Sequence, residues 1–313
     1  MNIQQLEYII AVDNCRHFAK AAEFCFVTQP TLSMMIQKLE DELDVKIFDR
    51  SRHPVEPTPI GLQIIEQARI SLKHFKQIKE IVENEQNTAK GTFRLGIIPT
   101  IAHYIVPLLL EKLNTQDAQI EVIMKENTTK NIISDIQKGF LDGGLLAGPL
   151  NHPEIREYSI YYEKFFAYVS PSDRRYEEKE IDLETLSADE VWLLESEHCL
   201  RGQIERLCHL KQAADAENTS VKYESGSIDT LVNIVDYNRG LTVIPEMHAM
   251  GLSEEKQDNL REFKGITAVR EVSLVTSNDY IRKTMINSIT DVIRSCVPKS
   301  MLNQELKKFV VDI

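Results

Sequence analysis

The 313-residue sequence has no apolar run that approaches the roughly 18 residues needed to cross a membrane. Residues 1–18 also lack a basic leader, a long apolar core and a small-residue cleavage site, so we expect a cytoplasmic protein with no membrane contact. Low-complexity tracts and short repeats are missing as well. Apolar residues make up 42% and charged residues 27%, which is the balance of an ordinary globular protein.

Cysteine is scarce and odd in number, and no two cysteines form a C-x-x-C pair. This pattern excludes a disulfide scaffold and argues against a zinc ribbon, so we expect neither a metal nor another cofactor. A cysteine with a function would then act through the reactivity of its thiol. The five cysteines are Cys15, Cys25, Cys199, Cys208 and Cys296.

A basic excess is absent, because 36 Lys and Arg stand against 48 Asp and Glu and give a formal net charge of −12. This excludes a surface that binds polyanions all over, but it leaves room for a local basic site. Residues 1–90 carry a net charge of −2 and residues 91–313 carry −10, so the acidic excess lies mostly in the second part. At roughly 150 residues per domain, the length predicts two or three domains.

The first part of the chain predicts one helix after another. Thr28 can cap a helix and Pro30 suits its first turn. Two short helices joined by a tight turn, with the second one polar on its outer face, are typical of a helix-turn-helix motif. The apolar residues of the second helix recur at helical spacing and are Leu32, Met35, Ile36, Leu39 and Leu43.

Residues 49–59 contain three prolines and three basic or imidazole side chains, which predicts a rigid, exposed wing. A long helix should begin with Thr58 as its cap and Pro59 in its first turn, and run to about residue 87. At about 1.5 Å per residue it would be a rod of about 45 Å, which should pair with a second copy. Its coiled-coil-like seam consists of Ile65, Ala68, Leu72, Phe75 and Val82.

After residue 91 strands alternate with helices, which predicts a parallel sheet covered on both faces and two α/β lobes around a cleft. The predicted strands are 93–98, 120–124, 143–147, 165–169, 191–194, 221–223, 241–244 and 272–276. The predicted helices are 101–113, 131–138 and 280–296. One lobe would comprise about 91–163 plus 268–300, and the other 164–267.

The N-terminal motifs run Phe18-Ala-Lys-Ala-Ala22, Val27-Thr-Gln-Pro-Thr-Leu-Ser33, Ile36-Gln-Lys-Leu-Glu40, Ile47-Phe-Asp-Arg50 and Thr58-Pro-Ile-Gly61. In order and spacing they resemble the LysR-type transcriptional regulators, with small departures at Asp44-Val45, Ile47 and Pro57. The resemblance covers the whole chain and implies an α plus α/β protein. Such a protein would comprise a winged helix-turn-helix domain (1–58), a linker helix for dimerisation (59–90) and a two-lobed effector domain like a periplasmic binding protein (91–313). It also implies a regulator rather than an enzyme, double-stranded promoter DNA as partner, and self-association as a dimer of dimers.

Short polar side chains at the start of the second helix suit base edges and phosphates in the major groove. Cationic side chains in the wing suit phosphates or the minor groove. For Lys38, Arg52 and His53 a purely solvated surface position stays open. The predicted DNA-binding set is Gln29, Pro30, Thr31, Ser33, Gln37, Lys38, Arg50 and Arg52.

A second informative stretch, Glu197-His-Cys-Leu-Arg-Gly-Gln203, is followed by Cys208. His198 and Arg201 flank Cys199, and such neighbours favour the reactive thiolate. If the stretch were one helix, the two cysteines would lie about 13.5 Å apart along its axis. A disulfide needs Cα atoms within about 4.4–6.8 Å, so bridging them would require the chain between them to unwind.

This stretch resembles the peroxide-sensing members of the LysR family. The resemblance implies that hydrogen peroxide oxidises Cys199 to a sulfenic acid and that Cys208 then forms a disulfide with it. It also implies a peroxide pocket made of Thr100, Thr129, His198, Arg201 and Arg270. RNA polymerase and a thiol reductant of glutaredoxin or thioredoxin type are further partners that it allows.

Three alternatives stay open. The chain could be a LysR-type regulator whose effector is a small molecule in the cleft between the lobes, with incidental cysteines. It could be a thiol peroxidase or hydrolase that uses Cys199 and His198, although no third orienting residue lies near His198. It could also be a solute-binding protein of the same shape. We interpret Cys15, Cys25 and Cys296 as inert, small apolar residues.

Overall fold

The computed structural model describes residues 1–85, 89–115, 120–187, 190–208 and 225–311. The chain divides into two compact units, Met1–Thr88 and Ala89–Ile313. The boundary between them falls within the segment predicted as the linker. No helix in the described ranges is long and apolar enough to span a lipid bilayer.

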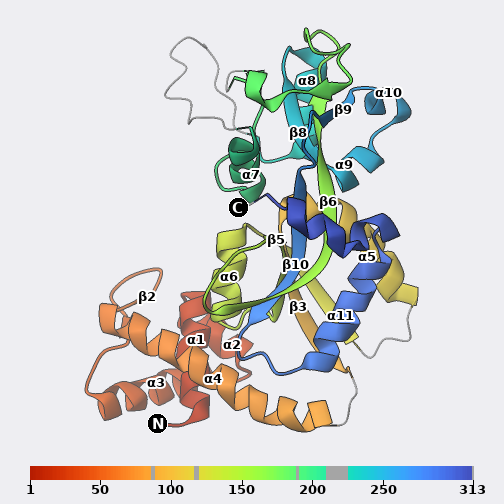
Figure 1. Ribbon diagram of the computed structural model, residues 1–313. Helices are drawn as coiled ribbons and strands as arrows, with labels where there is room; N and C mark the ends of the chain where they lie inside the picture. Colours follow the sequence, from red (N-terminus) through yellow and green to blue (C-terminus); the bar gives the residue numbers. More distant parts are fainter. Residues whose placement is uncertain (86–88, 116–119, 188–189, 209–224, 312–313) are drawn as a thin grey trace. The chain divides into compact units, whose positions relative to one another are not determined.

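The first unit is a winged helix-turn-helix (Figure 1). Its elements are α1 (Ile3–Cys15), α2 (Phe18–Phe24), α3 (Gln29–Leu43), β1 (Phe48–Asp49), β2 (Glu56–Pro57) and α4 (Pro59–Glu85). The Thr28 side chain accepts a hydrogen bond from the Thr31 backbone at the start of α3. The Thr58 hydroxyl does the same for the Gly61 backbone at 3.0 Å. Both predicted helix starts are therefore confirmed.

A buried carboxylate ties the wing to α3. Glu40 on α3 accepts hydrogen bonds from the backbone N–H groups of Ile47 (2.8 Å) and Phe48 (3.3 Å). Its second oxygen lies 3.4 Å from the Lys46 ammonium and 3.3 Å from the Arg50 guanidinium. The negative charge is thus fully paired, as a buried charge must be.

The predicted seam of α4 is divided between two roles. Ile65 and Ala68 are buried in the core of the first unit, where α4 packs against α1, and are not available to a partner. Phe75, Ile78 and Ile81 further along the helix remain exposed. The prediction of one continuous seam from Ile65 onward is therefore wrong for its first two members, because α4 first has to cover the helix-turn-helix core.

The second unit is built on one mixed eight-stranded sheet, in the order β4-β3-β5-β10-β6-β9-β7, with β8 also paired to β6. Its strands are β3 (Gly91–Ile97), β4 (Ile120–Glu126), β5 (Gly143–Gly148), β6 (Ile155–Val169), β7 (Glu180–Ile181), β8 (Leu241–Pro245), β9 (Leu260–Phe263) and β10 (Val269–Ser277). Its helices are α5 (Pro99–Thr115), α6 (Thr129–Gln137), α7 (Cys199–Leu207), α8 (Ile228–Tyr237), α9 (Glu246–Gly251), α10 (Glu254–Gln257) and α11 (Lys283–Ser295).

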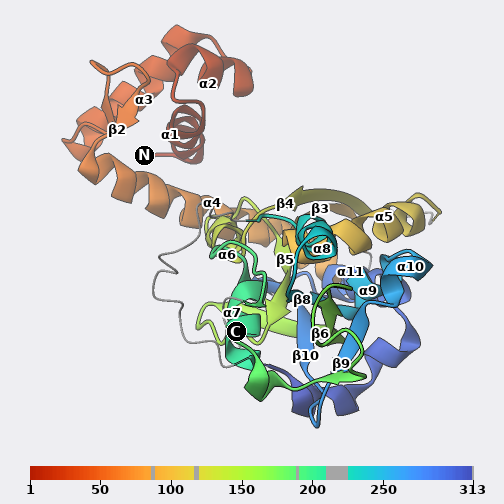
Figure 2. The same cartoon turned by 90° about the horizontal axis from the view of Figure 1, so that it is seen from above.

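The prediction of a parallel sheet is only partly right. Strands β4, β3 and β5 are parallel, but β10 runs antiparallel to both β5 and β6. The 15-residue β6 pairs first with β10 and then with β8 and β9, so it continues from one lobe into the other (Figure 1 and Figure 2). A strand that serves two lobes needs a return strand, which β10 provides.

Two hydrophobic cores define the two lobes. The first lobe packs α5, α6 and α11 around β3, β5 and β10. The second packs α7 and α8 around β8 and the far half of β6. The predicted strand 191–194 is wrong, because only Val191 and Leu194 make isolated bridges there. The predicted strand 221–223 lies outside the described residues.

Gly61 provides a test of how closely α4 approaches the wing. A Cβ atom at this position would overlap the Ile47 carbonyl oxygen. We expect Gly61→Ala to lower the free energy of unfolding by about 1–3 kcal/mol, because backbone atoms would have to shift. Denaturant unfolding of the purified protein measures this. The exposed neighbour Gln63→Ala should change the same quantity by less than about 0.5 kcal/mol, and equal effects would contradict the close approach.

Candidate redox site and DNA-binding face

Helix α7 holds the two candidate redox cysteines at its two ends. Cys199 is its first residue and Cys208 directly follows its last, and both thiols are free. The nine-residue step corresponds to about 13.5 Å along the helix axis, about twice the largest Cα separation that a disulfide tolerates. The helix that the sequence argument treated as a condition is therefore present.

The two thiols also belong to different hydrophobic cores. Cys199 packs against the core of the first lobe, whereas Cys208 is buried in the core of the second. Leu200, Ile204 and Leu207 anchor α7 in that second core. A bond between the two sulfurs therefore requires α7 to unwind and at least one thiol to leave its core.

Cys199 lines an open cavity of about 650 Å³, whose other lining residues come mainly from α6 and the start of α7. Thr129 at the first position of α6 and His198 line the same cavity. The Thr129 hydroxyl oxygen is buried and has no hydrogen-bond partner within the described part of the chain. An unpaired buried hydroxyl next to a thiol is suited to a small ligand that both donates and accepts hydrogen bonds.

A fully buried ion pair lies at the junction of the lobes. Arg270 on β10 donates from Nε to Glu163 Oε1 on β6 at 2.7 Å. It also donates from Nη1 to the Thr100 hydroxyl at 3.2 Å and from Nη2 to the Thr100 carbonyl at 3.1 Å. The other Glu163 oxygen accepts the Met247 N–H at 3.1 Å. The guanidinium is thus held rigidly in place, with Thr100 at the start of α5 as part of its cradle.

The electrostatics correct the prediction that His198 and Arg201 activate the thiol. Burial raises the pKa of Cys199, and the opposing groups are the positive charge of Arg270 and then the Thr129 hydroxyl. Arg201 instead donates to Glu205 Oε1 at 2.8 Å and to the Leu194 carbonyl at 3.1 Å. In this state burial outweighs the groups that favour the Cys199 thiolate, so the pKa of the thiol is raised although the residue lines the cavity.

His198 and Cys208, at the two ends of α7, also have defined surroundings. His198 Nε2 lies 3.3 Å from Glu195 Oε1, which corrects the expectation that no orienting residue lies near His198. Burial raises the pKa of the Cys208 thiol to about 12, so Cys208 is a protonated, weak nucleophile for as long as it stays in its core. The structure therefore keeps both sulfurs from reacting with one another until α7 changes.

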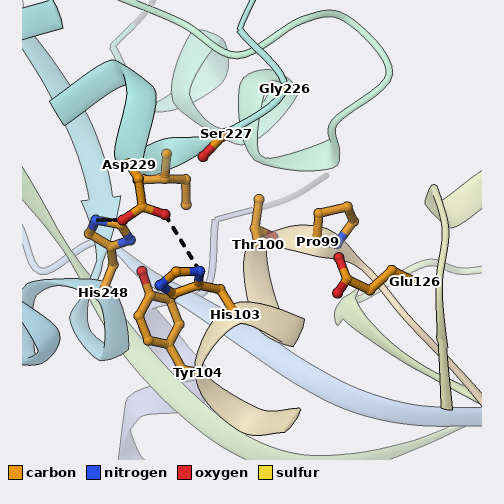
Figure 3. Close-up of a pocket in the computed structure, with 10 residues that line it drawn as sticks. Pro99, Thr100, His103, Tyr104, Glu126, Gly226, Ser227, Asp229 and His248 are labelled. Atoms are coloured by element: carbon orange, nitrogen blue, oxygen red, sulfur yellow. Dashed lines mark ion pairs between the residues drawn. The ribbon is translucent and has the colours of Figure 1, made fainter. Parts of the chain in front are cut away.

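The predicted peroxide pocket is divided between two cavities. Thr129, His198 and Cys199 share the first, but Thr100 lines a second cavity of about 200 Å³ (Figure 3). There Asp229 lies 3.5 Å from His103 Nδ1 and 3.8 Å from His248 Nε2. Arg270 is buried and contacts Thr100, and Arg201 turns away from the first cavity toward Glu205.

Sequence reasoning missed Glu163 and the His103–Asp229–His248 cluster, since these residues are far apart in the chain and form no motif. Burial lowers the pKa of His248 to about 4, so this imidazole is neutral at physiological pH. Its Nδ1 atom and the Tyr104 hydroxyl are buried without hydrogen-bond partners in the described ranges. Within those ranges no group of three or more His, Cys, Asp or Glu side chains is placed to hold a metal ion.

The predicted DNA-binding residues lie along α3 and the wing. Gln29, Pro30, Thr31, Gln37 and Lys38 are exposed. The structure therefore presents the polar outer face of α3 to solvent, as its helical spacing predicted.

The two wing arginines are already engaged in ion pairs. Arg50 donates to the Ser33 hydroxyl at 3.1 Å, pairs with Glu40, and stacks over the Phe18 ring at 5.0 Å. Arg52 pairs with Asp49 at 3.3 Å and Glu56 at 2.5 Å. They would have to exchange or share these partners to contact phosphates.

Comparison with known proteins places both units. Residues 3–62 match the bacterial regulatory helix-turn-helix protein, lysR family, and residues 86–295 match the LysR substrate binding domain. The hydrogen peroxide-inducible genes activator of Haemophilus influenzae is 32% identical over 82% of this chain and 84% of its own length. The DNA-binding transcriptional dual regulator OxyR of Escherichia coli K12 is 32% identical over 79% and 80%.

Solved structures agree with this placement. A full-length OxyR variant from Pseudomonas aeruginosa has 29% identity and a TM-score of 0.77, covering 95% of this chain and 99% of that one. An OxyR variant from Corynebacterium glutamicum with hydrogen peroxide bound has 25% identity and a TM-score of 0.58, covering 94% of each chain.

The raised pKa of Cys199 predicts how its reactivity depends on pH. Since the thiolate is the nucleophile, alkylation of reduced protein by iodoacetamide should keep accelerating above pH about 8.5, where an unperturbed cysteine begins to level off. Mass spectrometry of the Cys199 peptide measures the rate, and Cys199→Ser identifies its contribution. A plateau below pH 8.5 would contradict a Cys199 pKa raised by burial.

Proposed function

Because the chain belongs to the LysR family of bacterial regulatory helix-turn-helix proteins, we propose that it regulates transcription in response to hydrogen peroxide. Cys199 is the sensing thiol and Cys208 is its disulfide partner. The observation that carries the proposal is the placement of these two thiols at opposite ends of α7, with Cys199 beside a cavity that also holds the buried Thr129 hydroxyl. A protein with this function works where chromosomal DNA lies, in the cytoplasm.

The chemistry has two steps. The Cys199 thiolate attacks one peroxide oxygen, the O–O bond breaks, and hydroxide leaves and takes up a proton to become water. The Cys208 thiolate then attacks the sulfenic sulfur, the S–S bond forms, and a second hydroxide leaves as water. Two thiols are oxidised and one peroxide is reduced to two waters.

The side chains around Cys199 have distinct roles in this proposal. The Thr129 hydroxyl binds peroxide, and His198 lines the cavity beside it. The Arg270 charge favours both the thiolate and the departing hydroxide, and Thr100 acts by holding Arg270. Arg201 secures the start of α7 through Leu194 rather than touching peroxide.

The disulfide switches the regulator because it cannot form on an intact α7. Unwinding the helix changes the surface of the effector domain and thereby the assembly that carries the DNA-binding units. Exposed Phe75, Ile78 and Ile81 on α4 suit pairing with a second copy, and further effector-domain contacts would build a dimer of dimers. RNA polymerase and a glutaredoxin- or thioredoxin-type reductant complete the proposed cycle.

On DNA, α3 enters the major groove and the wing contacts the backbone. Gln29, Thr31, Gln37 and Lys38 are exposed on α3 for base and phosphate contacts. The two heads of a dimer would read half-sites about one helical turn apart, or a multiple of it.

A second candidate function rests on the smaller cavity. His248 and Tyr104 each have a buried polar atom without a hydrogen-bond partner in the described residues there, which favours a small polar effector held between the lobes. In that case the cysteines would be incidental. The two functions separate on the response of cysteine variants.

The sensing role predicts opposite behaviour for two serine variants. Cys199→Ser should abolish the peroxide response of DNA binding, whereas Cys208→Ser should accumulate a sulfenic acid that dimedone labels. Footprinting before and after a stoichiometric peroxide pulse, with mass spectrometry of both cysteines, measures this. Cys296→Ser is the control and should behave as wild type. A Cys199→Ser protein that still responds would favour the small-molecule effector.

The DNA-binding role predicts a loss at the start of α3. Gln29→Ala should weaken binding to a duplex selected from random sequences by wild-type protein about 5- to 150-fold, the range expected for one base contact. Gel shifts at fixed salt measure it. Gln63→Ala, an exposed glutamine on α4, should bind as wild type. Equal binding by Gln29→Ala and wild type would remove Gln29 from the interface.

A further inference from the structure

A segment near the end of the chain reaches the redox helix. After α11 the chain passes through two short 3-10 helices, Lys299–Leu302 and Gln304–Phe309. Met301 is buried in the core of the first lobe, and Val311 packs against the core of the second. Residues 303–311, the strap, therefore cross from one lobe to the other and end beside α7 (Figure 1 and Figure 2).

Two hydrogen bonds hold the end of the strap. The Val311 N–H donates to the Val269 carbonyl at the start of β10 at 2.8 Å. The Gln203 side chain on α7 donates from Nε2 to the Val311 carbonyl at 3.3 Å. Gln203 is fully buried. Within the described ranges this is the hydrogen bond that its side chain makes, and its Oε1 atom has no hydrogen-bond partner there. The strap thus connects β10 directly to α7.

The position of Gln203 makes this contact depend on the redox state. It lies four residues after Cys199 and five before Cys208, in the middle of α7. Bringing the two Cα atoms within about 4.4–6.8 Å requires the helix to break between them. Gln203 then loses the helical position from which it reaches Val311. The contact therefore belongs to the reduced form.

We propose that Gln203 is a positioning residue of the redox switch, which holds α7 to the strap in the reduced form and lets the strap go when the disulfide forms. This rests on the proposed function. An interaction made only in the reduced form stabilises the two thiols relative to the disulfide. Its loss shifts the thiol–disulfide equilibrium toward the disulfide, with the balance of atoms and electrons described above.

Gln203→Met tests the energetic part, since methionine keeps the length of the side chain and removes its amide. In glutathione redox buffers the ratio of disulfide to dithiol should rise about fivefold over wild type, which is about 20 mV more negative in reduction potential. Gln5→Met is the matched control, because Gln5 is also a buried glutamine that donates to a backbone carbonyl, of Met35 at 3.2 Å, but in the first unit. It should leave the ratio unchanged.

Truncation after Asn303 removes the rest of the strap and tests the same contact without changing the buried Gln203 side chain, so the test does not depend on the folding of the Gln203 variant. It should raise the same ratio at least as much as Gln203→Met, and combining both changes should add little, because they remove one shared contact. A ratio within twofold of wild type in both variants, or a shift toward the dithiol, would overturn the proposal.

Hydrogen exchange tests the release itself. The Val311 amide, protected by Val269 in the reduced form, should exchange at least tenfold faster in the disulfide form. Cys208→Ser treated with peroxide should keep its protection. Mass spectrometry on the same samples reports the disulfide. Without any disulfide the proposed function fails, whereas a verified disulfide with an unchanged Val311 amide defeats only the role of the strap.

Discussion

The distance between the two ends of α7 decides whether Cys199 and Cys208 can form a disulfide in the second unit. The nine-residue step from Cys199 to Cys208 along the helix axis is about twice the largest Cα separation that a disulfide allows. The helix is anchored in the hydrophobic core of the second lobe, in which Cys208 is also buried. A Cys199–Cys208 disulfide and an intact α7 therefore exclude each other. A chemical event on two sulfur atoms becomes a change of backbone, and everything packed on α7, including the strap, must respond to it.

The ion pair between Arg270 and Glu163 complements this constraint. It lies where the long strands β6 and β10 pass from one lobe to the other, and it holds Thr100 at the start of α5. The guanidinium favours the Cys199 thiolate from a position that no exposed charge could match, because water does not screen it. Burial opposes this effect and raises the pKa of the Cys199 thiol.

In the first unit a different buried charged residue, Glu40, holds two segments together. Glu40 on α3 holds the wing through two backbone N–H groups and also pairs with Arg50. The reading helix and the wing are thereby one rigid body, and its exposed polar face is set by the helix start at Thr28. Further along, α4 leaves Phe75, Ile78 and Ile81 exposed, on a different helix from the polar face of α3.

The sequence by itself determined the local features of the fold, because helix caps, helical spacing and motif order depend on residues that are close together in the chain. The starts of α3 and α4 and the exposed face of α3 follow from residues close together in the chain, whereas a helix between Cys199 and Cys208 was considered only as a condition. Tertiary structure decided what depends on distant partners: the antiparallel β10, the pairing of Arg270 with Glu163, and the contact of Gln203 with Val311. These arise from packing between segments more than 100 residues apart, such as Arg270 and Glu163 or Gln203 and Val311, for which no local pattern exists.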